Sequence, residues 1–410
     1  MGVDWLYKSV LWNIMSKIRK LLTVTGLAWL FDAMDVGLLS FILVAIQQEW
    51  QLSSVQVGWI GSVNSIGLAV GALTFGALAD QKGRKMMLMT TLLIFSIATG
   101  LSALTVGFVS FIILRFFVGV GLGGELPVAS TLVSESVPKE RRGRIIVLLE
   151  SFWAVGWLIA SLLAYFVMPK FGWRITLVIS ALTAFYVLVL RRHLPSDRQK
   201  NNLSQSSKAS IGEKLAQLFH KEHRQQTIML WIAWFMIMFS YYGIFLWLPS
   251  VLVGKGFSMV NSFGYVVIMT LAQLPGYFTS AWLVEKWGRK PVVASFLAGT
   301  AIFATVFGFS SSLAMIMISG MLLSFFNLGA WGAMYAYSPE LYPTSIRATA
   351  NGAAEGFGRL GGILGPLSIG FFLSLHFTFA HIFSIFSVAL VIAIIVILAM
   401  GKETRGTSIE

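Results

Sequence analysis

Five ionisable residues lie within long apolar stretches of the sequence, where a charged side chain is costly unless it meets a counter-charge or a water-filled cavity. They are Asp32, Asp35, Arg115, Glu125 and Arg359. A carboxylate in such a place can bind and release a proton, and a guanidinium group can bind the carboxylate of a solute. No nucleophile, base and metal-ligand set suited to catalysis is visible, so we expect neither an enzyme nor a metal or cofactor site. The pattern leaves the role of Glu125 open.

The stretches that carry these residues are long enough to cross a membrane as helices. The chain has 410 residues, of which 57% are hydrophobic and 11% charged. A helix of roughly 20 apolar residues spans a hydrocarbon core of about 30 Å. We therefore predict an all-α membrane protein with twelve transmembrane helices, at 21–46, 56–79, 86–105, 109–131, 145–168, 173–191, 227–253, 262–284, 291–309, 312–336, 348–373 and 377–400.

The spans divide the chain into domains. We predict a cytoplasmic N-terminal segment (1–20), a first six-helix domain (21–191), a cytoplasmic linker (192–226), a second six-helix domain (227–400) and a cytoplasmic tail (401–410). The N-terminal segment alternates apolar and basic residues, which suits a helix lying on the inner membrane surface, with a disordered tail as the alternative. The linker is polar and basic, with a short helix expected near 210–222.

The 30 lysine and arginine residues are unevenly distributed along these segments. With the N-terminus inside, Lys170, Arg174 and Lys255 are external, Arg115 and Arg359 are intramembrane, and all the others fall on cytoplasmic segments. This asymmetry follows the positive-inside rule and places both termini in the cytoplasm. The net charge of +13 thus reflects topology rather than nucleic-acid binding. We expect a monomeric, multi-pass protein of the cell membrane that interacts with lipid, protons and a small solute.

The second half of the sequence repeats the first at a constant offset of 205 positions (276 minus 71). The matching pairs include Gly71 and Gly276, Asp80 and Glu285, Arg84 and Arg289, Ser53 and Ser258, and Glu150 and Glu355. A repeat of this length predicts two pseudo-symmetric six-helix halves that rock around a substrate site between them.

The repeat separates the charges into two groups. Charged residues that help the two halves move should be present in both halves, whereas charged residues that bind one asymmetric solute should be present in only one half. We predict a cytoplasmic gate that closes when the cavity faces outward and opens when it faces inward. A solvated loop face is the alternative for its loop members. The predicted gate residues are Asp80, Arg84, Glu135, Arg142, Glu150, Glu285, Arg289, Glu340, Arg347 and Glu355.

A glycine-rich run, Gly119-Val120-Gly121-Leu122-Gly123-Gly124, superficially resembles a dinucleotide-binding loop. It lies inside an apolar span with no preceding soluble strand, so that reading is rejected. Gly119 and Gly123, like Gly67 and Gly71, stand four residues apart, which predicts helix faces that approach each other closely.

Several motifs resemble known families. The run Gly76, Leu78, Ala79, Asp80, Gly83, Arg84 and Lys85 is similar to the signature loop of the major facilitator superfamily. Three longer stretches, Trp29 to Gly37, Gly121 to Pro127 and Phe325 to Trp331, resemble bacterial niacin permeases. Those permeases belong among the metabolite:proton symporters, near relatives of synaptic vesicle proteins. The resemblance implies the major facilitator fold and transport driven by protons.

Asp35 and Arg115, with the residues that follow them, also resemble helices 1 and 4 of sugar:proton symporters, in which such a pair couples transport to protons. A rise of 1.5 Å per residue places Asp35 about 22 Å and Arg115 about 20 Å from the inner face, at one level. We predict that Asp35 carries the proton, and that Arg115 and Asp32 take part in proton coupling. Asp35 would bind the proton when it loses its arginine partner and release it when the pair forms again.

Arg359 is predicted to bind the substrate, because it matches a position that meets the negative group of the solute in related organic-anion carriers. Its planar fork suits a carboxylate. Asp32-Ala33-Met34-Asp35 is similar to an Asp-Gly-x-Asp element of aromatic acid:proton symporters, with Ala33 in place of glycine. The predicted substrate site is Arg359, Asp32, Trp29, Asn64, Tyr241, Tyr242, Gln273, Asn327, Trp331 and Tyr335, with Phe31, Trp247 and Phe326 as further aromatic candidates.

In this site the aromatic rings would form flat walls and the amides would bind a ring nitrogen. The sequence therefore predicts proton-coupled import of a small aromatic monocarboxylate, nicotinate (niacin) by preference, through alternating access. The alternatives are an organic cation or sugar:proton symporter and a membrane binding protein of the same fold that does not transport.

Overall fold

The computed structural model describes the backbone of residues 2–136, 142–193, 211–343 and 346–405. Side chains are described over most of these ranges, but not for residues 2–21, 125–136 and 142–147 or for a few single positions that include Asp80 and Arg84. The described elements are α1 (Gly2–Glu49), α2 (Ser54–Lys82), α3 (Arg84–Ser102), α4 (Phe108–Ser136), α5 (Arg142–Phe166), α6 (Met168–Ala181), the 3-10 turn η2 (Leu182–Phe185), α7 (Tyr186–His193), α8 (Ile211–Leu218), α9 (Arg224–Gly254), α10 (Met259–Leu271), α11 (Gln273–Trp287), α12 (Arg289–Phe309), α13 (Leu313–Glu340), α14 (Arg347–Ser374) and α15 (Phe379–Met400).

Eleven segments of the described chain are long and apolar enough to cross a membrane, and each overlaps a predicted span. Two of them combine shorter elements: Met168–Leu190 runs through α6, η2 and α7, and Met259–Trp287 runs through α10 and α11. The remaining predicted span falls on α4, whose apolar part Phe108–Gly124 is shorter within the described residues. All of these elements are helices, as the composition predicts.

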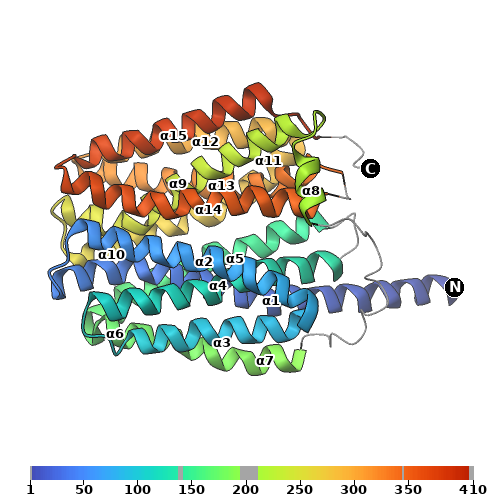
Figure 1. The fold of residues 1–410 in the computed structure, drawn as a ribbon, viewed down its shortest axis with the longest axis horizontal. Coiled ribbons are helices and arrows are strands. Elements are labelled where there is room, and N and C mark those ends of the chain that lie inside the picture. The colour runs from blue at the N-terminus through green and yellow to red at the C-terminus, as the bar shows by residue number, and fades with distance from the viewer. Residues whose placement is uncertain (1, 137–141, 194–210, 344–345, 406–410) are drawn as a thin grey trace.

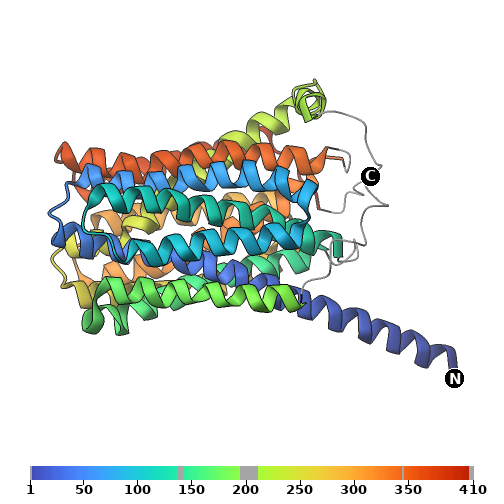
Figure 2. The ribbon, with the colours of Figure 1, turned by 60° about the horizontal axis from the view of Figure 1, so that its bottom comes forward.

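The helices form two groups that lie side by side (Figure 1), α1 to α7 in one and α9 to α15 in the other. Both chain termini emerge at the same end of the bundle, which we call the terminal end, and the opposite one the distal end. Helix α8 lies at the terminal end, between the two groups in sequence. Helix α1 is uninterrupted, so residues 2–20 extend the first span away from the bundle (Figure 2) instead of forming a separate helix.

Corresponding residues begin and end corresponding helices in the two halves. Ser53 exchanges hydrogen bonds with Gln56 before α2, and Ser258 accepts a hydrogen bond from the Asn261 amide before α10, so both serines satisfy otherwise unpaired amides. Gly83 and Gly288 then separate α2 from α3 and α11 from α12 with φ angles of 95° and 103°. Only glycine adopts this backbone conformation without strain, which explains its presence at this position in each half.

Glycine also allows α2 and α4 to approach each other closely, as the four-residue spacing predicts. A Cβ atom on Gly71 would collide with the carbonyl oxygen of Val120, and one on Gly123 with that of Leu68. Gly67 and Gly119 meet the facing backbone in the same way. The prediction of a tight helix-packing face is therefore confirmed, and α2 and α4 form a rigid support for Arg115.

At the distal end, cations predicted to be external are held by the protein. Arg174 pairs with Glu49 at 2.8 Å, and the Trp173 indole nitrogen donates to the same carboxylate at 2.6 Å. The Lys255 ammonium group donates to the carbonyl oxygens of Gly308 and Ser310 at 3.1 and 2.7 Å. These contacts join neighbouring helices within each half.

The two halves meet along their distal parts. The Ser62 hydroxyl donates to the Ile363 carbonyl at 2.6 Å, and the Ser161 and Thr270 hydroxyls lie 3.3 Å apart. Nearer the terminal end, a Cβ atom built on Gly352 or Gly356 of α14 would meet no described atom within 4 Å. Among the described residues, α14 is therefore packed against the first half near its distal end and faces open space near its terminal end.

Candidate functional site

Asp35 and Arg115 form a buried ion pair inside the first half. Arg115 Nη1 of α4 lies 3.3 Å from Asp35 Oδ2 of α1, and both side chains are only 1% exposed. Thr99 of α3 donates to the other carboxylate oxygen at 2.9 Å. The guanidinium group also lies over the Phe111 ring, 5.0 Å from its centroid. Separating such a pair would leave two uncompensated charges in an apolar interior. Binding of a proton to the Asp35 carboxylate would then be favoured, because it neutralises one of these charges.

Asp32 is as buried as Asp35 and lies one turn before it on α1. It also follows Trp29 by three residues, a spacing that places both side chains on one helix face. The Trp29 ring meets Trp153 of α5 edge to face, with centroids 6.5 Å apart. Asp32 is thus positioned between the ion pair and the aromatic residues at the interface of the halves.

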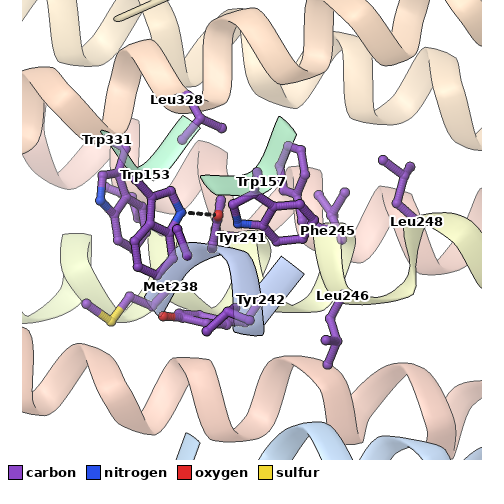
Figure 3. Packing of buried hydrophobic residues seen from close by; sticks show 14 of the residues in the cluster. Trp153, Trp157, Met238, Tyr241, Tyr242, Phe245, Leu246, Leu248, Leu328 and Trp331 are labelled. Carbon is purple, nitrogen blue, oxygen red and sulfur yellow. Dashed lines mark hydrogen bonds between the residues drawn. The ribbon is translucent and has the colours of Figure 1, made fainter. Parts of the chain in front are cut away.

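Aromatic side chains of α5, α9 and α13 surround Tyr241, among them Trp153, Tyr242 and Trp331 (Figure 3). The Trp153 indole nitrogen donates to the Tyr241 hydroxyl at 2.8 Å across the boundary between the halves. The Trp331 ring of α13 and the Tyr242 ring lie 4.8 and 5.2 Å from the Tyr241 ring, measured between centroids. We call the group formed by Trp29, Trp153, Tyr241, Tyr242, Trp331 and Tyr335 the aromatic cluster. It presents rings from α1, α5, α9 and α13 at one place, as flat walls for an aromatic solute require.

Arg359 of α14 lies beside the aromatic cluster. Its Nη1 donates to the Tyr242 hydroxyl at 3.0 Å, and the side chain is half-buried. No other hydrogen bond from this guanidinium group is formed with the described residues, so most of its five donors are available. Glu355, one turn nearer the terminal end on the same helix, is its acidic neighbour. Arg359 therefore combines a positive charge, unused donors and adjacent aromatic rings.

Three predicted amide side chains are buried with polar atoms that have no hydrogen-bond partner among the described residues. They are Asn64 of α2, Gln273 of α11 and Asn327 of α13, exposed by 4%, 0% and 2%. Asn327 precedes Trp331 by one turn on α13, so the two share a face. Buried polar groups are nearly always satisfied by protein, water or ligand. These amides are thus suited to bind a polar solute, although no described contact joins Asn64 or Gln273 to the aromatic cluster.

Some predicted aromatic residues lie elsewhere. Phe31 packs against Tyr186 with centroids 5.1 Å apart, and the Trp247 indole donates to the Pro366 carbonyl. Phe326 packs against Phe303 within the second half. The structure adds Trp153, which pattern reasoning missed because a tryptophan inside an apolar span usually packs against lipid or core. The sequence feature that could have identified Trp153 as a site residue is its position three residues after Glu150 on α5.

The described gate residues form a network within the second half. Arg289 at the start of α12 binds Glu340 at 2.9 Å and Glu285 at 3.2 Å. Glu340 also accepts from the Thr404 hydroxyl at 2.6 Å, and the Glu403 carboxylate accepts from the backbone amides of Arg289 and Lys290. A carboxylate at a helix N-terminus is favoured by the helix dipole. This network joins α11, α12, α13 and the tail.

The other predicted gate residues are placed differently or are not described. Arg347 donates from Nε to the Tyr342 carbonyl at 3.2 Å. Glu150 and Glu355 lie away from this network, near the aromatic cluster. The side chains of Asp80, Arg84, Glu135 and Arg142, and that of Glu125, lie outside the described residues. Among the side chains described, no gate ion pair crosses between the halves.

A helical membrane protein with two matched halves, and with charged and aromatic residues buried where they meet, is built as a solute transporter. The sequence profile of the Major Facilitator Superfamily matches residues 25–272 and 263–408. The chain belongs to this superfamily, and its named relatives are transporters rather than enzymes.

Curated relatives match over almost the whole chain. The putative niacin/nicotinamide transporter NiaP of Bacillus subtilis (strain 168) is 58% identical over 392 residues, which cover 96% of this chain and 98% of that protein. The niacin transporter NiaP of Acinetobacter baylyi (strain ATCC 33305 / BD413 / ADP1) is 45% identical and covers 95% of each chain. The cis,cis-muconate transport protein of the same organism is 32% identical, covering 85% of this chain and 86% of that protein. The expected resemblance to niacin permeases is thus confirmed, and synaptic vesicle 2-related proteins match too.

Among solved structures, the xylose transporter XylE from E. coli in a partially occluded inward open conformation superposes with a TM-score of 0.78. The match covers 96% of this chain and 100% of that chain at 17% sequence identity. This similarity establishes the fold of the chain.

Proposed function

We propose that the protein imports nicotinate, or a closely similar aromatic monocarboxylate, across the cell membrane together with protons by alternating access. Arg359 carries this proposal, because its unused donors lie beside an aromatic cluster at the interface of the halves. A carboxylate would dock on the guanidinium fork while the aromatic ring of the solute stacks against Tyr241, Tyr242 or Trp331. The names of the relatives support the same chemistry, since niacin and muconate are carboxylic acids.

Proton coupling is assigned to Asp35 with Arg115, and Asp32 connects this pair to the substrate site. Protonation of Asp35 would release Arg115 and loosen α1 from α4, which changes how the first half packs. The helix face that begins at Trp29 continues through Asp32, so a movement of α1 would reach the aromatic cluster. In this way the protonation of Asp35 and the shape of the substrate site would be linked.

The direction of opening follows from packing and charge. The distribution of basic residues favours a cytoplasmic location for the terminal end. Because the halves meet at their distal parts and α14 faces open space at Gly352 and Gly356, we assign this conformation to the inward-facing side of the cycle. The Arg289 and Glu340 network would belong to the cytoplasmic gate, with the first-half members Asp80, Arg84, Glu135 and Arg142 as its counterparts.

Competition for substrate uptake tests the proposed substrate class. Proteoliposomes that contain the protein should take up labelled nicotinate, and unlabelled nicotinate and benzoate should compete much more strongly than nicotinamide or glucose. Strong competition by glucose would favour a sugar carrier, and competition by a quaternary ammonium compound would favour a cation carrier. Binding without uptake at any pH would favour a binding protein that does not transport.

A further inference from the structure

Glu150 and Glu355 are related by the internal repeat, yet they lie close to each other. They differ by the same 205 positions (355 minus 150) that relate the two halves. Residues related by a pseudo-two-fold axis approach each other only where they lie near that axis. The Glu355 carboxylate acts electrostatically on Glu150 across the interface of the halves, which places the pair near the centre of the bundle.

Helix geometry places both carboxylates directly beside the proposed substrate site. Glu150 precedes Trp153 on α5 by three residues, and Trp153 donates to Tyr241. Glu355 precedes Arg359 on α14 by four residues, and Arg359 donates to Tyr242. Both spacings keep the side chains on one helix face. The two carboxylates therefore lie one turn toward the terminal end from the aromatic cluster.

The surroundings of the pair contain less positive than negative charge. Glu150 is 2% exposed and forms no hydrogen bond or ion pair with the described residues. Arg359 is the cation that acts on Glu355, and the neutral hydroxyls of Tyr277 and Tyr335 face the pair from α11 and α13. On α1, Asp32 is a further buried acidic residue. The side chains of α4 beyond Gly124, including Glu125, lie outside the described residues.

Two ionised carboxylates in a poorly solvated place repel each other even though Arg359 acts on Glu355, and a bound proton removes the repulsion. We propose that Glu150 and Glu355 form a second proton site, in which one proton is shared at rest and a second is taken up when an anionic substrate binds Arg359. The substrate carboxylate competes with Glu355 for the guanidinium group, so Glu355 loses its counter-charge and binds the proton instead. This inference rests on the proposed binding of a carboxylate at Arg359 and deepens it, because it makes proton uptake a direct consequence of substrate binding.

The proposed site can be tested by counting the protons that the protein takes up when nicotinate binds. Calorimetric titration of nicotinate into the purified protein, in two buffers of different ionisation enthalpy, should show uptake of about one proton per nicotinate near neutral pH. The affinity should then fall about tenfold per pH unit above that range, because fewer carboxyls remain protonated at higher pH. Glu150→Gln should retain proton uptake, since Glu355 still pairs with Arg359 until the substrate displaces it. Glu355→Gln should lose it, because the remaining carboxyl of Glu150 has no arginine for the substrate to displace. The double variant should take up none, and Glu222→Gln, at an exposed position outside the site, should behave as the wild type.

A ligand-free measurement tests the proton held at rest. Infrared spectra of the wild type at neutral pH should contain a protonated-carboxyl band that is absent from Glu150→Gln, in which Glu355 has Arg359 to itself. Glutamine has nearly the size of glutamate, and the thermal unfolding of each variant shows whether it folds.

Full proton uptake by the double variant or by Glu355→Gln, no uptake by the wild type, or loss of uptake in Glu150→Gln would overturn the shared site. Absence of that band from the wild type would do the same. Failure of the wild type to bind nicotinate at all would instead reject the proposed function, and the infrared measurement would still decide on the pair.

Discussion

At the scale of single residues, the two arginines inside the bundle have different partners. Arg115 is fully buried against Asp35, whereas Arg359 donates to a neutral tyrosine hydroxyl and has donors left for a solute. A guanidinium group keeps its charge under all physiological conditions, so its role depends on which anion is nearby. This difference supports the proposed assignment of proton coupling to the first half and of substrate recognition to the second.

Asp35→Asn tests the coupling role. The variant should bind nicotinate measurably, yet it should not accumulate it above the external concentration when a proton gradient is applied, because asparagine cannot carry the proton. Uptake by proteoliposomes and binding by calorimetry provide the two readouts. Accumulation with the wild-type pH dependence would exclude Asp35 as the coupling residue.

Arg359→Gln tests substrate recognition, because glutamine keeps some donors but loses the charge. Removal of one charge-assisted interaction should weaken nicotinate binding by about 1.5–3 kcal/mol, roughly 10- to 150-fold. Nicotinamide binding should change much less. Arg359→Lys should recover only part of the loss, since an ammonium group lacks the two-pronged geometry. Equal losses for acid and amide, accompanied by lower thermal stability, would show that Arg359 only holds α14 in place.

The identity of the buried charged residues and the pairing of Asp35 with Arg115 were predictable, but their other contacts were not. A charge in an apolar span is visible in any sequence, and counting residues places Asp35 and Arg115 at one level. Thr99 and Trp153 are ordinary residues for membrane helices, and only the folded structure shows that Thr99 of α3 meets Asp35 of α1 and that Trp153 of α5 meets Tyr241 of α9. Glu150 was assigned to a gate by its repetition, whereas its surroundings place it near the aromatic cluster.

At the scale of the elements, backbone contact between α2 and α4 supports the buried ion pair. Gly71→Ala should lower the free energy of unfolding by about 1–3 kcal/mol, because a Cβ atom there collides with the Val120 carbonyl. Gly352→Ala is the matched control, since it lies in α14 where a Cβ atom meets no described atom within 4 Å. Thermal unfolding in detergent measures both, and equal stabilities for the two variants would contradict tight packing at Gly71.

The spans themselves follow from hydrophobic length, which is why the predicted segments and the observed helices agree closely. Breaks inside them do not follow from composition. The turn η2 divides the sixth span at a place with no proline or glycine, whereas the break at Ala272 between α10 and α11 lies three residues before Pro275, which has no backbone amide to donate. Residues 2–20 show the opposite case: their basic pattern suggested a separate segment, and the structure continues α1 through them.

At the scale of the whole molecule, the Arg289 and Glu340 network is proposed to set the balance between conformations without touching the solute. Glu340→Ala should therefore reduce the turnover of uptake more than the affinity for substrate. The chain has no cysteine, so a single Gly352→Cys reporter can measure access from the terminal side. Loss of the network should increase the labelling of this cysteine, and unchanged labelling with unchanged turnover would exclude a gating role.

Proton-driven accumulation of nicotinate tests the central claim most directly. Proteoliposomes loaded at neutral pH and diluted into acidic medium should concentrate labelled nicotinate well above the external level. A proton ionophore should reduce the internal concentration to the external one, and Asp35→Asn should behave like the ionophore-treated sample. Concentration of nicotinate with no proton gradient, or a complete lack of uptake in its presence, would contradict the account.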